Sequence, residues 1–281
     1  MTDNGLLEYY KNCSNKDGFL ELDKMPLKKS HNSKYYTQTP DGKGFYVKKC
    51  GYGEVDAEVL VSQIYAQLGL ATAIYLPAIV GDRTAVISND ISGKNSLRMF
   101  DYLLDNVNAH LPQRAQFGVY DISRFYLPQA IRTLGLVESA NLASGNIDFH
   151  IGNYFVKVNK QSDFVFDKLP IEDIFPFDYG MCYHSFFGDE YARNVYYTTL
   201  TQNSIGNKML LKTKPQAINL LKENPLIQSN ISSYEIAEKL GNVDVYGIAE
   251  DIAQTTGYEI SPSLLKAEAN SFYEVAEQFA K

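Results

Sequence analysis

Three oxygen-bearing side chains in the middle of the chain have the types and order that phosphate chemistry needs. Asp148 and Asn153 lie five residues apart, and Asp178 closes an apolar stretch that ends in Asp-Tyr-Gly. A carboxylate can orient an acceptor hydroxyl and take its proton, while an amide and a second carboxylate can hold Mg²⁺ on phosphates. The pattern indicates phosphoryl transfer from ATP, with Asp148 at the acceptor and Asn153 and Asp178 as metal ligands.

The same chemistry needs a lysine that pairs with the phosphates. Lys48 lies in the β-rich segment Phe45–Lys49, and Lys49 is its rival. Neighbours on a strand face opposite ways, so only one of them can point at a nucleotide. If Val47 packs on the helix side of the sheet, Lys48 faces the nucleotide cleft. We take Lys48 as the phosphate lysine and keep Lys49 as the alternative.

A glutamate must hold that lysine in place. Glu58 and Glu54 lie one turn apart in a segment with helical spacing, away from the centre of its apolar stripe. The distance from Gly69, which ends the helix, favours Glu58. For both residues the competing interpretation is a solvated helix face.

The elements that must position these side chains follow from hydrophobic spacing. A helix is predicted over Val55–Leu68, stopped by Gly69. The turn signal at residues 40–44 joins two β-rich segments into a hairpin. Strands are predicted over four segments: Lys34–Gln38, Phe45–Lys49, Ile74–Leu76 and Thr84–Ser88.

After Asn89 the pattern changes. Helices are predicted over Leu97–Val107 and Pro128–Leu142, and nearly everything beyond Pro215 has helical spacing. A second hairpin is predicted from 153–158 and 164–166. The sequence therefore predicts an α+β protein with a small β-rich N-lobe containing one helix, residues 1–90, and a larger, mainly helical C-lobe, residues 91–281.

The motif Asp148-x-His150-x-x-Asn153, followed by Asp178-Tyr179-Gly180, resembles a known pair of motifs. It is similar to the catalytic and metal motifs of the HipA-like and phosphatidylinositol 3/4-kinase-like branch of the kinase superfamily. In this branch the histidine follows the catalytic aspartate, whereas ordinary protein kinases place it before. The resemblance spans roughly 30–183 and implies a two-lobed protein-kinase-like fold.

Further site residues are implied by this resemblance. It places the phosphate-covering loop at Ser33 and Lys34, and the hinge that meets adenine at Ser88 and Asn89. It also implies that His150 braces the catalytic loop. The phosphate loop departs from the family pattern because it has no glycine.

The function that the resemblance implies is a serine/threonine protein kinase that uses ATP and Mg²⁺ and acts as a toxin or effector. The alternatives are a lipid or small-molecule kinase on the same fold, a pseudokinase that serves as a binding module, and nucleotidyl transfer by a repurposed kinase fold. The region after Tyr191 matches nothing in the family, so the identity of the acceptor is not implied.

The composition restricts the classes of partner and the cellular compartment that we expect. The 281 residues are 45% hydrophobic and 21% charged, as in soluble globular proteins, and the net charge of −7 argues against a nucleic-acid partner. The three cysteines contain no CxxC pair, which argues against a disulfide framework or a zinc site and favours the cytosol. No signal peptide or membrane-length apolar run is present. We therefore expect a cytoplasmic protein with ATP and a protein substrate as partners, although export without an N-terminal signal would leave the same pattern.

Overall fold

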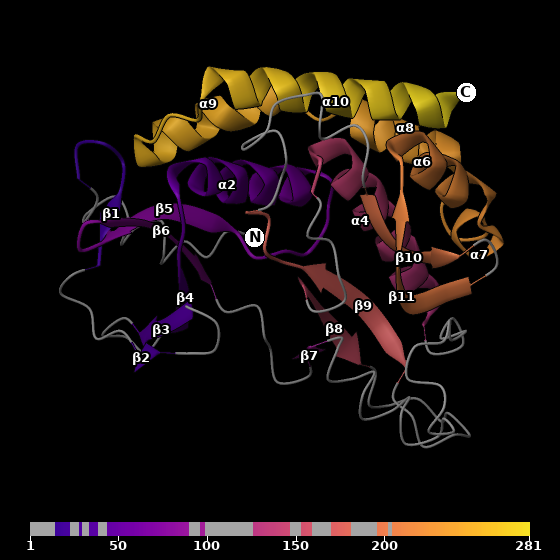
Figure 1. The fold of residues 1–281 in the computed structure, drawn as a ribbon, viewed down its shortest axis with the longest axis horizontal. Helices are drawn as coiled ribbons and strands as arrows, with labels where there is room; N and C mark the ends of the chain where they lie inside the picture. Colours follow the sequence, from indigo (N-terminus) through magenta and orange to yellow (C-terminus); the bar gives the residue numbers. More distant parts are fainter. Residues whose placement is uncertain are drawn as a thin grey trace.

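The computed structural model has a sheet with one helix followed by a mainly helical part (Figure 1). The structure describes residues 15–22, 28–29, 34–38, 44–89, 96–98, 126–146, 153–158, 170–180, 196–201 and 204–281.

Six strands form a mixed sheet in the order β1-β5-β6-β4-β3-β2. Neighbouring strands are antiparallel, except that β1 runs parallel to β5. Helix α2 connects β4 to β5 and packs against β5 and β6 (Figure 1). The four predicted strands and the first hairpin are confirmed. The bounds are β1 Leu20–Glu21, β2 Lys28–Lys29, β3 Lys34–Gln38, β4 Gly44–Lys49, α2 Tyr52–Gln67, β5 Tyr75–Val80 and β6 Arg83–Asn89.

Helix α2 begins and ends at local signals. Glu54 in its first turn accepts a hydrogen bond from the backbone N–H of Gly51 at 2.5 Å, which satisfies a donor at the helix start. After Gln67 the chain turns at Gly69, whose φ of 80° lies in the left-handed region that glycine adopts without penalty. The predicted helix is confirmed, and it starts one turn earlier than expected.

The second part of the chain combines two small sheets with helices. Strands β7, β8 and β9 form one antiparallel sheet, and β10 and β11 form a hairpin. The bounds are β7 Ser96–Arg98, α4 Pro128–Ser144, β8 Tyr154–Val158, β9 Ile171–Pro176, β10 Tyr196–Thr201, β11 Ser204–Lys212, α6 Lys214–Glu223, α7 Pro225–Gln228, α8 Ser233–Gly241, α9 Val245–Thr256 and α10 Pro262–Ala280.

Two features of this part differ from the sequence predictions. The helix predicted from Leu97 is wrong at its start, because Ser96–Arg98 pair with β8 and Leu97 lies opposite Val156. A short apolar run fits either a strand or a helix, and here a cross-strand partner decides it. The hairpin β10–β11 was not predicted. The expected strand at 164–166 lies outside the described residues; within them, β8 pairs with β9.

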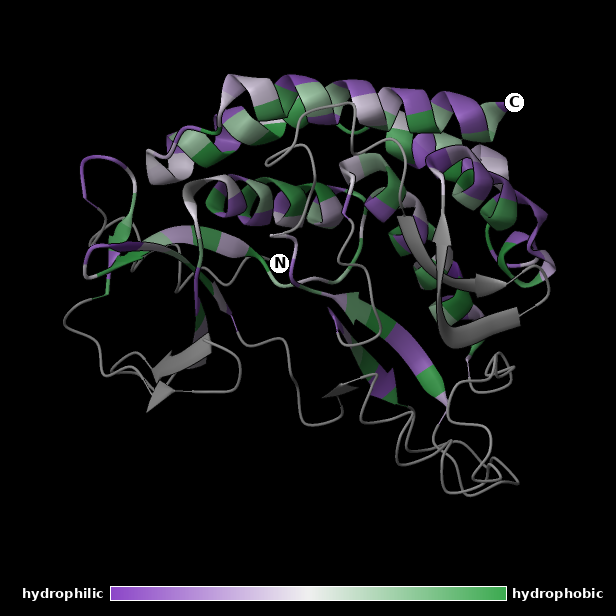
Figure 2. Cartoon of the chain, in the orientation of Figure 1, coloured by the Kyte–Doolittle hydropathy of each residue, from purple (hydrophilic) through white to green (hydrophobic). Residues whose placement is uncertain are grey.

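The two parts share one hydrophobic core. It combines buried side chains of α2, α4, β8, β9 and the C-terminal helices. A second, smaller cluster joins side chains of β1, β4, β5 and β6 on the opposite face of the six-stranded sheet from α2. Figure 2 shows hydrophobic and hydrophilic residues alternating along α10, as expected of a helix that buries one face. Helix α2 is covered on nearly all sides, since residues 55–62 are all buried. Among the helices that the structure describes, none is long and apolar enough to cross a membrane.

Candidate active site

Lys48 on β4 lies between two carboxylates from distant parts of the chain. Its Nζ atom is 2.6 Å from Glu58 Oε1 on α2 and 2.5 Å from Asp178 Oδ1 after β9. The Glu58 side chain is 0% exposed, whereas those of Lys48 and Asp178 are 19% and 18% exposed. The structure therefore brings together three residues that the sequence singled out, at the junction of the sheet and the second part of the chain.

The register of β4 explains why Lys48, and not Lys49, makes these contacts. Lys48 lies opposite Val86, whose side chain belongs to the core that contains α2. Val47 packs in the second cluster, so the supposition that it lies on the helix side is wrong. The helix and the lysine contacts share one face of the sheet, and strand alternation then directs Lys48 towards Glu58.

The single ammonium of this cluster is stabilised by two carboxylates. Burial alone would lower the pKa of the Lys48 ammonium, but the carboxylates of Glu58 and Asp178 outweigh burial and hold that pKa above its ordinary value. Burial raises the pKa of the Glu58 carboxyl to about 7, against the opposing effect of Lys48. Lys48 therefore remains a cation at neutral pH, and two acidic groups fix its position.

The backbone after β9 is shaped to present Asp178. Asp178 has a φ of 72°, in the left-handed region that few residues other than glycine adopt. The N–H of Tyr179 donates a hydrogen bond to Glu58 Oε2 at 2.8 Å. A Cβ atom on Gly180 would lie 2.9 Å from Lys48 Nζ, so any larger residue here would displace the end of the lysine. Left-handed backbone at a non-glycine residue is typical of functional sites.

Tyrosines that the sequence analysis did not single out surround this turn. The Tyr179 ring packs against those of Tyr65 and Tyr75, with centroids 4.9 Å and 6.1 Å away. The Tyr179 hydroxyl donates to the carbonyl of Pro176 at 2.9 Å and also contacts Thr72. These contacts join segments far apart in the sequence, so no local spacing could predict them.

The two predicted metal ligands lie at the same end of a strand pair. Asn153 precedes β8 and Asp178 follows β9, and Tyr154 lies opposite Pro176 in the ladder. The Phe177 N–H donates to the Asn153 carbonyl oxygen at 3.0 Å. An amide oxygen and a carboxylate are oxygen donors of the kind that Mg²⁺ prefers, and this ion needs only a few protein ligands beside phosphate and water. The donor chemistry fits Mg²⁺.

The segment with the predicted catalytic motif is anchored where it begins. Asn146 donates from Nδ2 to Asn141 Oδ1 on α4 at 3.0 Å, and Tyr65 of α2 donates to the same oxygen at 2.9 Å. The chain leading to Asp148 is thus tied to both α2 and α4. Asp148 and His150 themselves lie outside the part of the chain that the structure describes.

The residues assigned by resemblance to the nucleotide are placed only in part. Ser33 is not among the described residues, and Lys34 starts β3 with its backbone opposite Lys48. Ser88 is buried, and Asn89 ends β6. Within the described residues, the Asn89 Oδ1 atom is buried and has no hydrogen-bond partner. A buried acceptor of this kind could be satisfied by a donor on a bound ligand.

Comparison with solved structures bears on the fold. No family model matches the sequence, and no curated protein matches it. The crystal structure of CtkA, a proinflammatory kinase of Helicobacter pylori, matches with a TM-score of 0.60 and 13% identity, covering 92% of this chain and 95% of that one. The fold is kinase-like. The predicted two-lobed α+β architecture is confirmed by this match.

Two weaker matches complete the comparison. HipA from Shewanella oneidensis, solved with HipB and operator DNA, has a TM-score of 0.46 and 14% identity over 90% of this chain and 65% of that one. The N-terminal fragment of LepB from Legionella pneumophila has a TM-score of 0.41 and 12% identity over 88% of this chain and 46% of that one.

Proposed function

We propose that this protein is a kinase that uses ATP and Mg²⁺ and phosphorylates serine or threonine residues of proteins, acting as a toxin or effector. The observation that carries the proposal is the contact of Lys48 with both Glu58 and Asp178. Phosphoryl transfer consists almost entirely of positioning and charge compensation, and these three residues supply both. The kinase-like fold shared with CtkA supports the same function.

Each site residue has a distinct role in this proposal. Lys48, held by Glu58, pairs with the phosphates, and Asp148 orients the acceptor hydroxyl and takes its proton. Asn153 and Asp178 would hold Mg²⁺, which when bound compensates the phosphate charge. His150 braces the segment that carries Asp148.

The remaining assignments concern the rest of the nucleotide. Ser33 and Lys34 would cover the phosphates, and Ser88 and Asn89 would meet the adenine where β6 leaves the sheet. The buried, unpartnered Oδ1 atom of Asn89 supports a ligand at this position among the described residues. Nothing among the described residues favours a lipid acceptor over a protein.

The proposal is tested by incubating the purified protein with radiolabelled ATP and Mg²⁺, alone and with cell lysate. Gels detect labelled proteins, and lipid chromatography detects labelled lipids. We expect label on proteins, bound to serine or threonine, and none when the metal is chelated. Label in the lipid fraction alone would establish a lipid kinase, and ATP binding without any transfer would establish a pseudokinase.

Lys48→Met should lower the rate of transfer by about a hundredfold, because preorganised charge at the reacting phosphate is lost. Lys49→Met is the matched control, since Lys49 lies on the opposite face of β4 and should leave the rate near that of wild type. Initial rates at saturating ATP provide the measurement. Equal losses in the two variants would contradict the assignment of Lys48.

Gly180→Ala should slow transfer by about tenfold while the protein stays folded, since small misplacements of catalytic groups are costly. The new methyl group would lie 2.9 Å from Lys48 Nζ and 3.2 Å from Glu58 Oε1, and the flexible lysine would give way. Gly241→Ala on α8 is the control, because its Cβ would meet Ala276 at an ordinary 3.7 Å. Transfer rates and thermal unfolding temperatures are measured for both variants. An unchanged rate in Gly180→Ala would show that the exact place of Lys48 is unimportant.

A further inference from the structure

Helix α2, which carries Glu58, is held from its other side by the connection between α9 and α10. Asp56 is 9% exposed and accepts two hydrogen bonds from this connection. The Tyr258 hydroxyl donates to Asp56 Oδ1 at 2.6 Å, and the Ser261 N–H donates to Oδ2 at 3.2 Å. Residues two apart on a helix point to different faces. Asp56 therefore ties one face of α2 to the C-terminal helices, while Glu58 reaches Lys48 from another face.

The hydroxyl of Tyr258 is aimed by close packing. Tyr258 is 6% exposed, and its ring meets that of Phe19 edge-on with centroids 5.0 Å apart. A Cβ atom on Gly18 would lie 2.4 Å from the Tyr258 backbone nitrogen, so the two backbones are in direct contact. A side chain fixed in this way gives a directional hydrogen bond at little further cost in conformational entropy.

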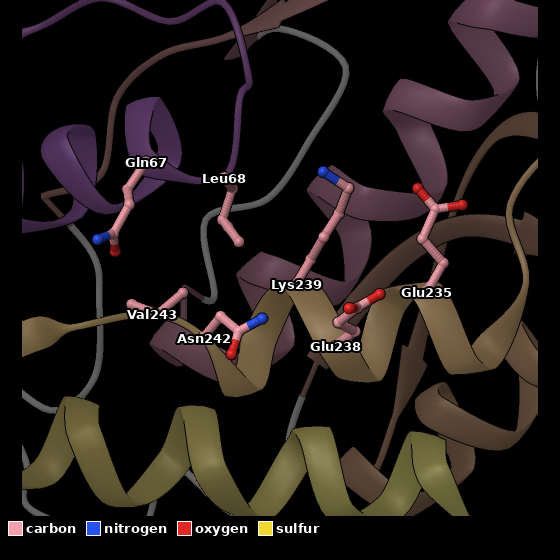
Figure 3. A pocket seen from close by; sticks show the side chains of 7 residues that line it. All are labelled: Gln67, Leu68, Glu235, Glu238, Lys239, Asn242 and Val243. Carbon is pink, nitrogen blue, oxygen red and sulfur yellow. The ribbon is translucent and has the colours of Figure 1, made fainter.

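Two hollows flank the packed seam between α2 and the C-terminal helices. A groove of about 390 Å³ is lined by residues of α2 and α9, and a pocket of about 440 Å³ lies where the end of α2 faces α8 (Figure 3). Near the far end of α2, Gln67 accepts a hydrogen bond from the Asp244 N–H at 3.1 Å. Alongside the hydrophobic core that α2 shares with the C-terminal helices, polar contacts at both ends of the seam fix the position of α2.

We propose that Asp56 and Tyr258 form a brace that sets the position of α2, and through it the position of Glu58 against Lys48. The inference rests on the proposed function for its effect on catalysis, but the brace itself is a matter of structure. Helix α10 packs against α4, α6 and α8, and α9 packs against α2. The C-terminal helices thus connect the helical part of the molecule to the ATP-side ion pair. Asp56 and Tyr258 are positioning residues for phosphoryl transfer.

The variant Tyr258→Phe tests the brace because it removes one hydroxyl and keeps the packed ring. We expect turnover to fall by about tenfold, as small misplacements of catalytic groups do. The KM for ATP should change little, because the residues assigned to the adenine, Ser88 and Asn89, are untouched. Tyr273→Phe is the matched control: its hydroxyl contacts Glu277 on the exposed surface of α10. Asp56→Asn should reproduce the effect of Tyr258→Phe.

The reactivity of a cysteine next to α2 reports the position of this helix independently of kinase activity. Cys50 lies directly before the N-cap of α2, and its thiol is 3.7 Å from the Lys48 carbonyl oxygen. Burial raises the pKa of this thiol to about 12, so alkylation should be slow in the wild-type protein. If the brace holds α2, the rate of alkylation at Cys50, followed by peptide mass mapping, should rise several-fold in Tyr258→Phe and Asp56→Asn. In Tyr273→Phe it should stay at the wild-type rate.

The two readouts separate the brace from the kinase assignment. Wild-type alkylation rates at Cys50 in both Tyr258→Phe and Asp56→Asn would overturn the brace, whatever the transfer assay gives. An equal rise in Tyr273→Phe would overturn it as well. If the wild-type protein transfers no phosphate but both brace variants expose Cys50, the proposed function fails and the brace stands.

Discussion

Asp178→Asn is expected to abolish phosphoryl transfer from Mg-ATP. The carboxylate has two partners in the proposed mechanism: the metal, and the ammonium of Lys48 at 2.5 Å. Asparagine is nearly the same size but carries no charge. The phosphate charge would then go uncompensated at the moment of transfer, which is where charge compensation has its largest effect on rate.

An aspartate on the strand that leads to Asp178 serves as the matched control. Asp173 of β9 accepts hydrogen bonds from Thr133 Oγ1 at 2.8 Å and from the Ile174 N–H at 2.9 Å, both structural contacts. Asp173→Asn should therefore keep its activity, whereas Asp178→Asn should lose both transfer and the Mg²⁺-dependent part of nucleotide binding. Activity at the wild-type level in a folded Asp178→Asn protein would remove Asp178 from the site.

The pairing of Lys48 with Glu58 could be predicted from the sequence because both positions obey local rules. Strand alternation limits the lysine to one of two neighbours. A glutamate in the first turn of a helix commonly caps it, and Glu54 does so by accepting from the Gly51 N–H. That capping contact is the signal that could have separated Glu54 from Glu58. The face of the sheet was predicted wrongly, because burial on either face gives the same alternating pattern.

Other parts of the site depend on contacts that no local pattern contains. The brace joins Asp56 to a hydroxyl 202 residues away. Only the packing of α9 on α2 brings these groups together, so the residue spacing within either segment could not predict the contact. The rings around Tyr179 are equally non-local. The hairpin β10–β11 did have a signal, since Tyr196–Thr201 is rich in the aromatic and β-branched residues that strands favour.

Asp148→Asn is expected to separate chemistry from binding. The variant should bind Mg-ATP nearly as well as wild type and lose about a hundred- to ten-thousand-fold of turnover, the usual value of a positioned base. Asparagine cannot take the proton of the acceptor hydroxyl. The neighbouring anchors remain in place, because Asn146 is tied to Asn141 and the Asn153 carbonyl oxygen accepts from Phe177.

The comparison with Asp178→Asn makes this result decisive. Calorimetric titration with ATP in the presence of Mg²⁺ gives the affinity, and single-turnover rates give the chemical step. Replacing a metal ligand lowers both the affinity for ATP and the rate of the chemical step, whereas replacing a catalytic base lowers only the rate. Because Asp148 precedes the metal-side Asn153 by five residues, the alternative role as a third metal ligand is a real competitor. If the affinity of Asp148→Asn for ATP falls in step with its turnover, Asp148 binds the metal and another group must orient the acceptor.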